Sequence, residues 1–191
     1  MRLHVFDIEK IDDLIFNDAK PKLTKDSSIM EIFTDFKHIP PMLIEETASA
    51  LHVREIMEKA HVNLEIVIDN KRHFRGILPL LNLSDEELGK KAIMEGREKA
   101  DLLIKDCMWR KSELHALDYK EFKGATINEV IDALQHIGQR YCLVVDHEEH
   151  QIRGVISAGD ISRALNIPID IQRTGIGTSF LTIFNRLNHG I

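Results

Sequence analysis

The sequence predicts an α+β fold in which two pseudo-symmetric β-α-β-β-α units pack through their small sheets. Three segments of the first half recur in the second half in the same order: an apolar pattern of helical spacing, a short apolar strand and a strand led by glycine. The pairs are 53–60 with 130–137, 66–69 with 143–146, and 76–78 with 154–156. The offset within a pair is constant for the first two pairs and grows by a single position for the third. Self-similarity at a fixed period indicates a duplicated structural unit.

One such unit is too small to bury both its sheet and its helices. Two units packed sheet to sheet share one core, and the clefts between them are natural positions for a ligand. The chain has 191 residues, which is enough for this arrangement. We therefore expect an N-terminal extension at 1–25, unit 1 at 26–83, a connecting helix at 84–104, unit 2 at 105–167 and a C-terminal tail at 168–191.

Unit 1 carries a helix signal ahead of its first strand. Asp26-Ser27-Ser28 is typical of a helix start, and the apolar residues of 29–36 share one helical face. Pro40 and Pro41 end that pattern, and residues 42–44 form a short strand leading into the repeat. The sequence thus predicts a helix over 29–36.

The segment between the repeats is strongly helical. Ser84 is followed three residues later by Glu87, the spacing of a capping box. Glutamate–lysine pairs four residues apart then support the helix. A thin apolar stripe remains for docking: Leu88, Ala92, Ala100 and Leu103. We expect this helix to act as a connecting strut.

Unit 2 begins with a strand-like stretch at 114–122 and ends in a short helix at 160–165, halted near Pro168. The tail places an amphipathic helix at 179–187 after the glycines Gly175 and Gly177. Its large apolar residues are too many to leave in water. Two alternatives stay open: the helix packs on its own module or dimer, or ligand binding releases it to a partner protein.

Composition excludes several classes of protein. The hydrophobic fraction of 43% and charged fraction of 29% describe a soluble globular chain. The net charge of −6 argues against nucleic-acid binding, and the apolar runs are too short to cross a membrane. The two cysteines, Cys107 and Cys142, lack a CxxC partner and are expected to pack as buried, reduced thiols, which favours the cytoplasm.

The second repeat closes with Gly154-Val155-Ile156-Ser157-Ala158-Gly159-Asp160. Here the chain resembles the tandem CBS-domain family (the Bateman module), as a stand-alone protein. The units of that family end in Gly, two aliphatic residues, Ser or Thr, two variable residues and Asp. Three further segments are similar to family motifs: 104–108, 126–130 and 143–146. The resemblance covers roughly residues 40–83 and 104–166. It implies an adenine nucleotide or adenosyl ligand (AMP, ADP, ATP or S-adenosylmethionine) and a homodimer.

The chemistry of this turn also favours a ligand site in unit 2. A strand that runs into a helix start presents free N–H groups to an anion, and Ser157 can add a hydroxyl for a phosphate oxygen. Asp160 can accept both hydroxyls of a ribose, while Gly159 keeps the turn uncluttered. The alternative is that Ser157 only caps the helix, with Asp160 near its favourable dipole end. The predicted ligand-binding set is Ser157, Ala158, Gly159, Asp160, Met108, Tyr141 and Cys142.

Unit 1 departs from the motif at the two positions that matter. Pro79 stands where unit 2 has Ser157, and Asn82 stands where unit 2 has Asp160. Proline lacks the hydroxyl and a backbone donor, and asparagine is a poorer double acceptor for a ribose. We therefore expect one strong nucleotide site per chain.

No catalytic constellation accompanies this site. The turn 147–150 reads His-Glu-Glu-His, one residue short of the HExxH spacing, and is expected to be a solvated turn without a metal. Trp109 could stack on a purine or pack in the core. We expect no catalytic residues, no catalytic cofactor and no enzyme activity. The alternative to a nucleotide sensor is a ligand-free module for dimerisation and partner docking, and apolar residues on the helix at 130–137, such as Ile131 and Ala133, would need a dimer to cover them.

Overall fold

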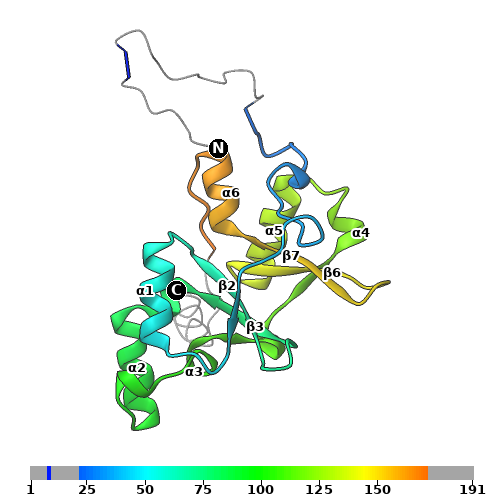
Figure 1. The fold of residues 1–191 in the computed structure, drawn as a ribbon. Coiled ribbons are helices and arrows are strands. Elements are labelled where there is room, and N and C mark those ends of the chain that lie inside the picture. Colours follow the sequence, from blue (N-terminus) through cyan, green and yellow to red (C-terminus); the bar gives the residue numbers. More distant parts are fainter. Residues whose placement is uncertain (1–7, 10–21, 172–191) are drawn as a thin grey trace, which may run out of the picture.

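The computed structural model describes residues 8–9 and 22–171. Two small sheets form its centre (Figure 1). Sheet 1 has the order β1-β2-β3-β4, with β1 and β2 parallel and the other pairs antiparallel; sheet 2 has the order β5-β6-β7, with β5 and β6 parallel and β7 antiparallel. The strands are β1 (Leu43–Glu45), β2 (Leu64–Ile68), β3 (Phe74–Pro79), β4 (Trp109–Arg110), β5 (Ala116–Asp118), β6 (Tyr141–Asp146) and β7 (Gln151–Ser157).

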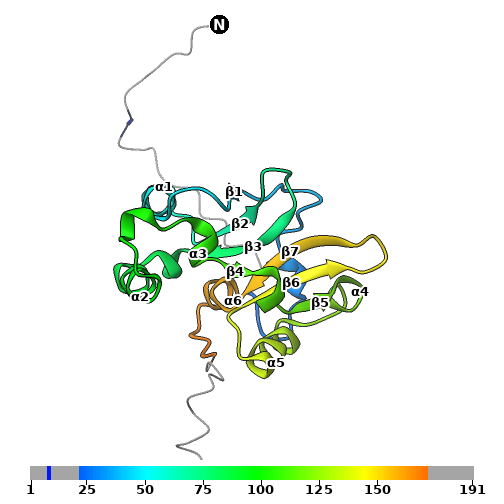
Figure 2. The same cartoon turned by 90° about the horizontal axis from the view of Figure 1, so that it is seen from below.

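Helices cover the outer faces of the two sheets (Figure 2). The α-helices are α1 (Ala50–Lys59), α2 (Asp85–Glu95), α3 (Ile104–Cys107), α4 (Tyr119–Phe122), α5 (Ile127–Ile137) and α6 (Ala158–Leu165). Short 3-10 turns are η1 (Ile29–Glu31), η2 (Leu80–Leu83), η3 (Lys99–Asp101) and η4 (Lys111–Glu113). The predicted α+β fold of two similar units is confirmed.

The duplication extends to details of the backbone. The bulge between Val67 and Ile68 in the β2–β3 pair recurs between Val144 and Val145 in the β6–β7 pair, at the corresponding position of the repeat. Such bulges are specific features of a strand pair and not defects. The first helical residue after each pair is held in the same way. Leu80 N–H donates to the Asn63 carbonyl at 2.9 Å, and Ala158 N–H donates to the Arg140 carbonyl at 3.0 Å.

Three apolar clusters hold the layers together. One lies between the sheets and contains Ile66, Ile77 and Leu143, so the units meet sheet to sheet as predicted. A second joins sheet 1 to α1 and α2, and a third joins sheet 2 to α5 and α6. Leu88 and Ala92 of α2 belong to the second cluster. The helix between the repeats is therefore part of the core around unit 1.

The helix predicted over 29–36 is wrong. Only Ile29–Glu31 forms a 3-10 turn, and the following residues run along β7. Phe36 N–H donates to the Arg153 carbonyl at 2.7 Å, and the Phe33 ring sits where a side chain at Gly154 would have to be. Contacts with unit 2 thus override the helical spacing. Likewise, the strand-like stretch at 114–122 divides into β5 and α4, because the Asp118 carboxylate caps the amides of Lys120 and Glu121.

The segment that precedes each unit in the sequence packs on the other unit. Ile29 N–H donates to the Ala125 carbonyl at 3.1 Å, beside a bridge between Ser28 and Thr126. In the same way Ile104 N–H donates to the Ala48 carbonyl at 2.9 Å, beside a bridge between Leu103 and Ser49. We call residues 28–36 and 103–111 the leading segments.

Within the described residues, no helix is long and apolar enough to cross a membrane. The helix predicted at 179–187 and nearly all of the predicted extension 1–25 lie outside the described residues.

Candidate functional site

A cleft of about 580 Å³ lies between the two units at the carboxyl ends of β3 and β7, and we call it the central cleft. Unit 1 contributes residues of α1, η2 and the start of α2. Unit 2 contributes Arg140, Tyr141, Ser157, Gly159, Asp160 and Arg163. Tyr141 and Ser157 are direct partners in the β6–β7 pair, which brings the start of one strand beside the end of the other.

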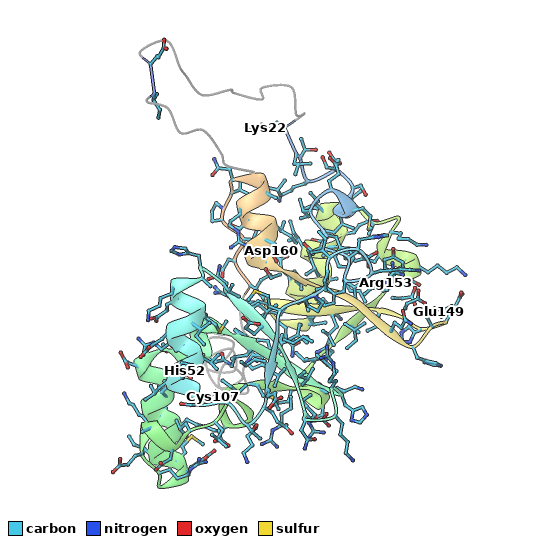
Figure 3. All side chains as sticks on the ribbon, viewed as in Figure 1. Lys22, His52, Cys107, Glu149, Arg153 and Asp160 are labelled. Carbon is cyan, nitrogen blue, oxygen red and sulfur yellow. The ribbon has the colours of Figure 1, made fainter. Side chains whose placement is uncertain are left out.

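Ser157 ends β7 in an extended conformation and caps α6. Its Oγ accepts a hydrogen bond from Asp160 N–H at 3.0 Å and donates one to Asp160 Oδ2 at 2.5 Å. The other carboxylate oxygen of Asp160 pairs with Arg163, one turn along the helix. The capping alternative thus describes the contacts of Ser157 with Asp160 in this structure. Ser157 is buried, but the Asp160 side chain is 42% exposed and lines the cleft, at the base of α6 and away from Arg153 on β7 (Figure 3).

The start of α6 offers donors to an anion. Ala158 N–H is used by the Arg140 carbonyl and Asp160 N–H by Ser157, whereas Gly159 N–H has no acceptor among the described residues. Arg140 is exposed at the same edge of the cleft, and its guanidinium forms no ion pair with any residue that the structure describes. A helix start with a free N–H and a nearby guanidinium is suited to bind a phosphate.

Sequence reasoning missed Arg140 and Arg163. Arg140 directly precedes β6, and only the pairing of Tyr141 with Ser157 in the structure places it beside the turn. Arg163 lies three residues after Asp160, which places both on one face of α6.

The other predicted ligand residues lie in different surroundings. Tyr141 lines the cleft, packs edge to face on Trp109 with ring centroids 5.6 Å apart, and has a pKa raised by burial. Ala158 and Cys142 are buried in the core of unit 2. Burial also raises the pKa of the Cys142 thiol to about 12. Met108 lines another cavity, which shares no residue with the central cleft. The structure brings together Ser157, Gly159, Asp160 and Tyr141.

The equivalent positions of unit 1 are occupied by structural contacts. Pro79 is buried at the end of β3, and Asn82 Nδ2 donates to the Cys107 carbonyl at 2.8 Å. On the unit 1 side of the cleft, Arg54 bridges Asp85 at 2.8 Å and Glu58 at 2.9 Å. The carboxylates on this side of the cleft, Glu58 and Asp85, are thus paired with Arg54, much as Asp160 is paired with Arg163.

We find no centre for metal or thiol chemistry in the described part of the chain. No group of three or more His, Cys, Asp or Glu side chains there could hold a metal ion. Residues 147–150 form the turn between β6 and β7. Both cysteines are free thiols. Burial raises the pKa of Cys107 to about 11, so this thiol stays protonated and is a poor nucleophile at neutral pH.

Comparison with known proteins matches residues 122–167 to the family model of the CBS domain. An uncharacterised conserved protein from Pyrococcus horikoshii has the same fold, with a TM-score of 0.54 and 14% identity over 78% of this chain and 98% of that one. A CBS-domain-containing protein from Agrobacterium tumefaciens matches with a TM-score of 0.52 and 13% identity, over 80% of this chain and 98% of that one. The structure of CBSX2, a CBS-pair protein from Arabidopsis thaliana, in complex with AMP matches with a TM-score of 0.50 and 16% identity. The match covers 72% of this chain and 94% of that one.

Curated relatives also match, and the following one does so over a shorter stretch. Tripartite motif-containing protein 44 from Bos taurus is 32% identical over 84 residues, which is 42% of this chain and 25% of that protein. The chain thus spans about a quarter of the length of this curated relative.

The family match falls on unit 2, from the last residue of α4 to just beyond α6, and so includes Ser157 and Asp160. Unit 1 repeats the strand pairing of unit 2, including its bulge. Residues 122–167 of unit 2 therefore match the CBS domain, and the chain consists of two units of one topology packed through their sheets, the fold of the solved structures named above.

Proposed function

We propose that this protein is a regulatory module whose central cleft binds an adenine nucleotide, with AMP as the first ligand to test. The observation that carries the proposal is a set of groups gathered around the start of α6: the Gly159 N–H, the Ser157 hydroxyl, the Asp160 carboxylate and the Arg140 guanidinium. Among the described residues, the Gly159 N–H has no acceptor and Arg140 forms no ion pair. CBSX2, which has the same fold, has been crystallised with AMP. ADP, ATP and S-adenosylmethionine remain alternative ligands of the same site.

The proposed contacts rest on the positions of these groups in the central cleft. The ribose hydroxyls displace Arg163 from Asp160 and donate to its carboxylate, and the phosphate accepts from Gly159 N–H, Ser157 and Arg140. Tyr141 forms part of the wall of the cleft. A ligand in this cleft would contact both units, because both line it. Every residue in this arrangement has a binding role, so we propose binding and no catalytic step.

Replacing Asp160 by asparagine is expected to weaken AMP binding about ten-fold or more, because a hydrogen bond to a charged group contributes about 1.5–3 kcal/mol. Isothermal titration calorimetry of AMP into the purified chain measures this. The matched control is Asp132→Asn, on the exposed side of α5, which removes the same charge away from the cleft. Equal affinity in wild type and Asp160→Asn would refute the assignment of Asp160.

We expect one strong AMP site per chain. Pro79 and Asn82 replace the polar pair in unit 1, and Asn82 is already bonded to the Cys107 carbonyl. The same calorimetric titration gives the stoichiometry. Two sites of equal, high affinity per chain would contradict this prediction and would show that unit 1 uses other residues to bind the nucleotide.

A homodimer is also expected, but not for the reason found in the sequence. Ile131 is only 5% exposed because it packs in the core of its own unit. The most exposed large apolar side chains on the described α-helices are instead those of Ile93 and Met94 on α2, 83% and 81% exposed. Light scattering should therefore give about twice the chain mass of 21.9 kDa. A mass of one chain at tens of micromolar would contradict the dimer.

These exposed residues also support the second candidate function, a ligand-free module for dimerisation and docking of a protein partner. A dimer that binds no adenine nucleotide would favour it.

The two free thiols fit a reducing compartment, and the cytoplasm is our proposed location.

A further inference from the structure

The duplicated fold allows the two leading segments to be compared position by position. Ile29 and Ile104 make the same backbone contact, as do Ser28 and Leu103, which sets the register between the two segments. The glycines confirm this register. A Cβ on Gly154 would lie 2.7 Å from the Thr34 carbonyl oxygen, and a Cβ on Gly76 would lie 2.0 Å from the Trp109 carbonyl oxygen. The next residues, Asp35 and Arg110, therefore occupy equivalent positions.

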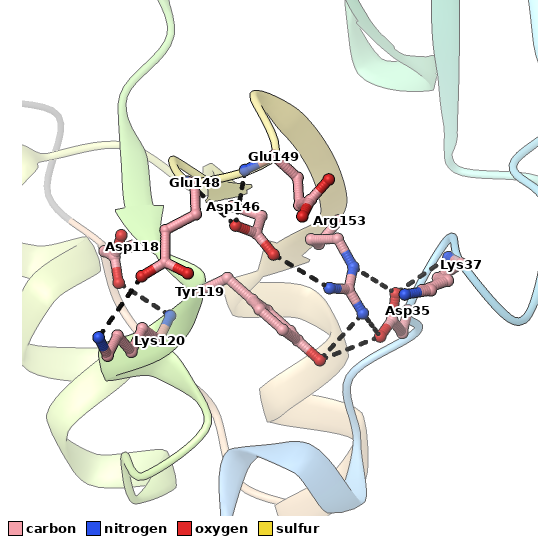
Figure 4. A network of polar contacts seen from close by, with 9 residues as sticks. All are labelled: Asp35, Lys37, Asp118, Tyr119, Lys120, Asp146, Glu148, Glu149 and Arg153. Carbon is pink, nitrogen blue, oxygen red and sulfur yellow. Dashed lines mark hydrogen bonds and ion pairs between the residues drawn. The ribbon is translucent and has the colours of Figure 1, made fainter.

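In unit 2 this position completes a buried charge network (Figure 4). The Arg153 guanidinium donates to the two carboxylate oxygens of Asp35 at 2.5 and 3.1 Å, and to Asp146 at 3.4 Å. It also lies over the Tyr119 ring, 3.9 Å from the centroid, and donates to the Tyr119 hydroxyl at 3.0 Å. The Arg153 and Asp35 side chains are each only 10% exposed. Here the arginine of the third strand of the unit is neutralised by a carboxylate of the leading segment.

In unit 1 the same position carries the opposite charge. Arg75 on β3 is the equivalent of Arg153, since each directly precedes the repeated glycine at the bulge of its strand pair. The leading segment places Arg110 where unit 2 has Asp35. Arg75 retains one carboxylate partner, Glu46, at 3.1 Å. The Arg110 side chain forms no ion pair within the residues that the structure describes. Two guanidinium groups thus stand where unit 2 has a guanidinium and a carboxylate.

A cavity of about 710 Å³ opens at this place. Its charged lining is Arg75, Lys105, Arg110 and Lys111 against the single carboxylate of Glu46. Neither Lys105 nor Lys111 has an ion-pair partner in the described part of the chain. Four cations around one carboxylate are unexpected in a protein whose net charge is −6. Like charges held together raise the local potential and attract an anion.

We propose that this basic cavity binds a phosphate-bearing small molecule, whose phosphate group takes the place that the Asp35 carboxylate takes in unit 2. Arginine favours phosphate and carboxylate because its planar donors bind two oxygens at once. Phe74 and Met108 add apolar wall for the uncharged part of the ligand, and Ser112 adds a hydroxyl. The site lies at the start of β3, whereas the central cleft lies at its end, and the two cavities share no residue.

Nuclear magnetic resonance of the full chain, titrated with inorganic pyrophosphate as probe, tests this proposal. We expect saturable shifts of the backbone amides of Lys105, Arg110, Lys111 and Ser112. Arg110→Ala should weaken the binding read from these amides about ten-fold or more. Arg110→Asp should abolish it, because the introduced carboxylate can pair with Arg75 as Asp35 pairs with Arg153.

Lys25→Asp is the matched control, because it changes the charge by the same amount at an exposed lysine without a side-chain contact in the described part of the chain. Its pyrophosphate affinity should equal that of the wild type. The proposal would be overturned if the shift changes of amides 105–112 did not saturate with pyrophosphate, or if they were equally large in Arg110→Asp. The amides of Gly159 and Asp160 report the central cleft in the same spectra, so failure of this site is distinguishable from failure of the proposed nucleotide site.

Discussion

Replacing Arg153 by alanine is expected to lower the free energy of unfolding by about 3–5 kcal/mol, the usual cost of removing one partner from a buried ion pair. Arg153 is 8% exposed and is bonded to Asp35, Asp146 and the Tyr119 hydroxyl. Without it, two carboxylates are left without their cation, and the leading segment 28–36 loses its strongest side-chain anchor on β7. Urea denaturation followed by circular dichroism measures the change.

Arg75→Ala is the control for this variant because it removes the equivalent arginine of unit 1. Arg75 and Glu46 form a pair whose side chains are 50% and 21% exposed. Exposed pairs contribute at most about 1 kcal/mol, so Arg75→Ala should be close to wild type in stability. Equal losses in the two variants would show that burial does not set the strength of the Arg153 network.

The same network predicts how stability depends on pH. The hydrogen bonds that Arg153 donates hold the pKa of Asp35 below its ordinary value of 3.8, although burial acts in the opposite direction. A carboxyl with a lowered pKa in the folded state contributes stability above its unfolded pKa and loses it as pH falls through the folded value. Wild type should therefore lose this contribution below about pH 4. In Arg153→Ala the slope in that range should be smaller, because burial of Asp35 is no longer opposed by Arg153.

The network also shows what sequence patterns cannot predict. Asp35 lies 118 residues before Arg153, and Tyr119 lies 34 residues before it. Periodicity identifies residues that share a face of one helix or strand, but it carries no information about which distant segments meet. For that reason the apolar spacing of 29–36 predicted a helix, whereas packing against β7 gives an extended segment after Glu31.

The features that the sequence predicted correctly depend on short local motifs or on the internal repeat. The two units, their strand pairs and the cap at Ser157 follow from short motifs that occur twice or lie at a helix start. Cys142 was placed in the ligand set beside Tyr141, but neighbouring residues of a strand point to opposite faces. Tyr141 therefore lines the cleft while Cys142 packs in the core of unit 2. Arg140 was missed because nothing in its own neighbourhood shows that Tyr141 pairs with Ser157.

Replacing Gly76 by alanine is expected to destabilise the fold by about 3 kcal/mol, the upper part of the range for overpacked sites. The added Cβ would lie 2.0 Å from the Trp109 carbonyl oxygen and 3.0 Å from its carbonyl carbon, so backbone has to move. Gly76 pairs with Arg110 in the short contact between β3 and β4, which holds the leading segment 103–111 on sheet 1. We therefore expect the substitution to weaken the pairing of β3 with β4 as well. Thermal and urea unfolding of the variant measure it.

Gly89→Ala makes the same chemical change where there is room for it. Gly89 lies inside α2, and its added Cβ would meet only the flexible end of the Lys99 side chain, at 3.4 Å. Because glycine is about 0.5–1 kcal/mol less favourable than alanine inside a helix, this variant should be more stable than wild type. The two variants should thus move stability in opposite directions. A Gly76→Ala protein as stable as wild type would mean that β4 does not lie against β3 as the structure has it.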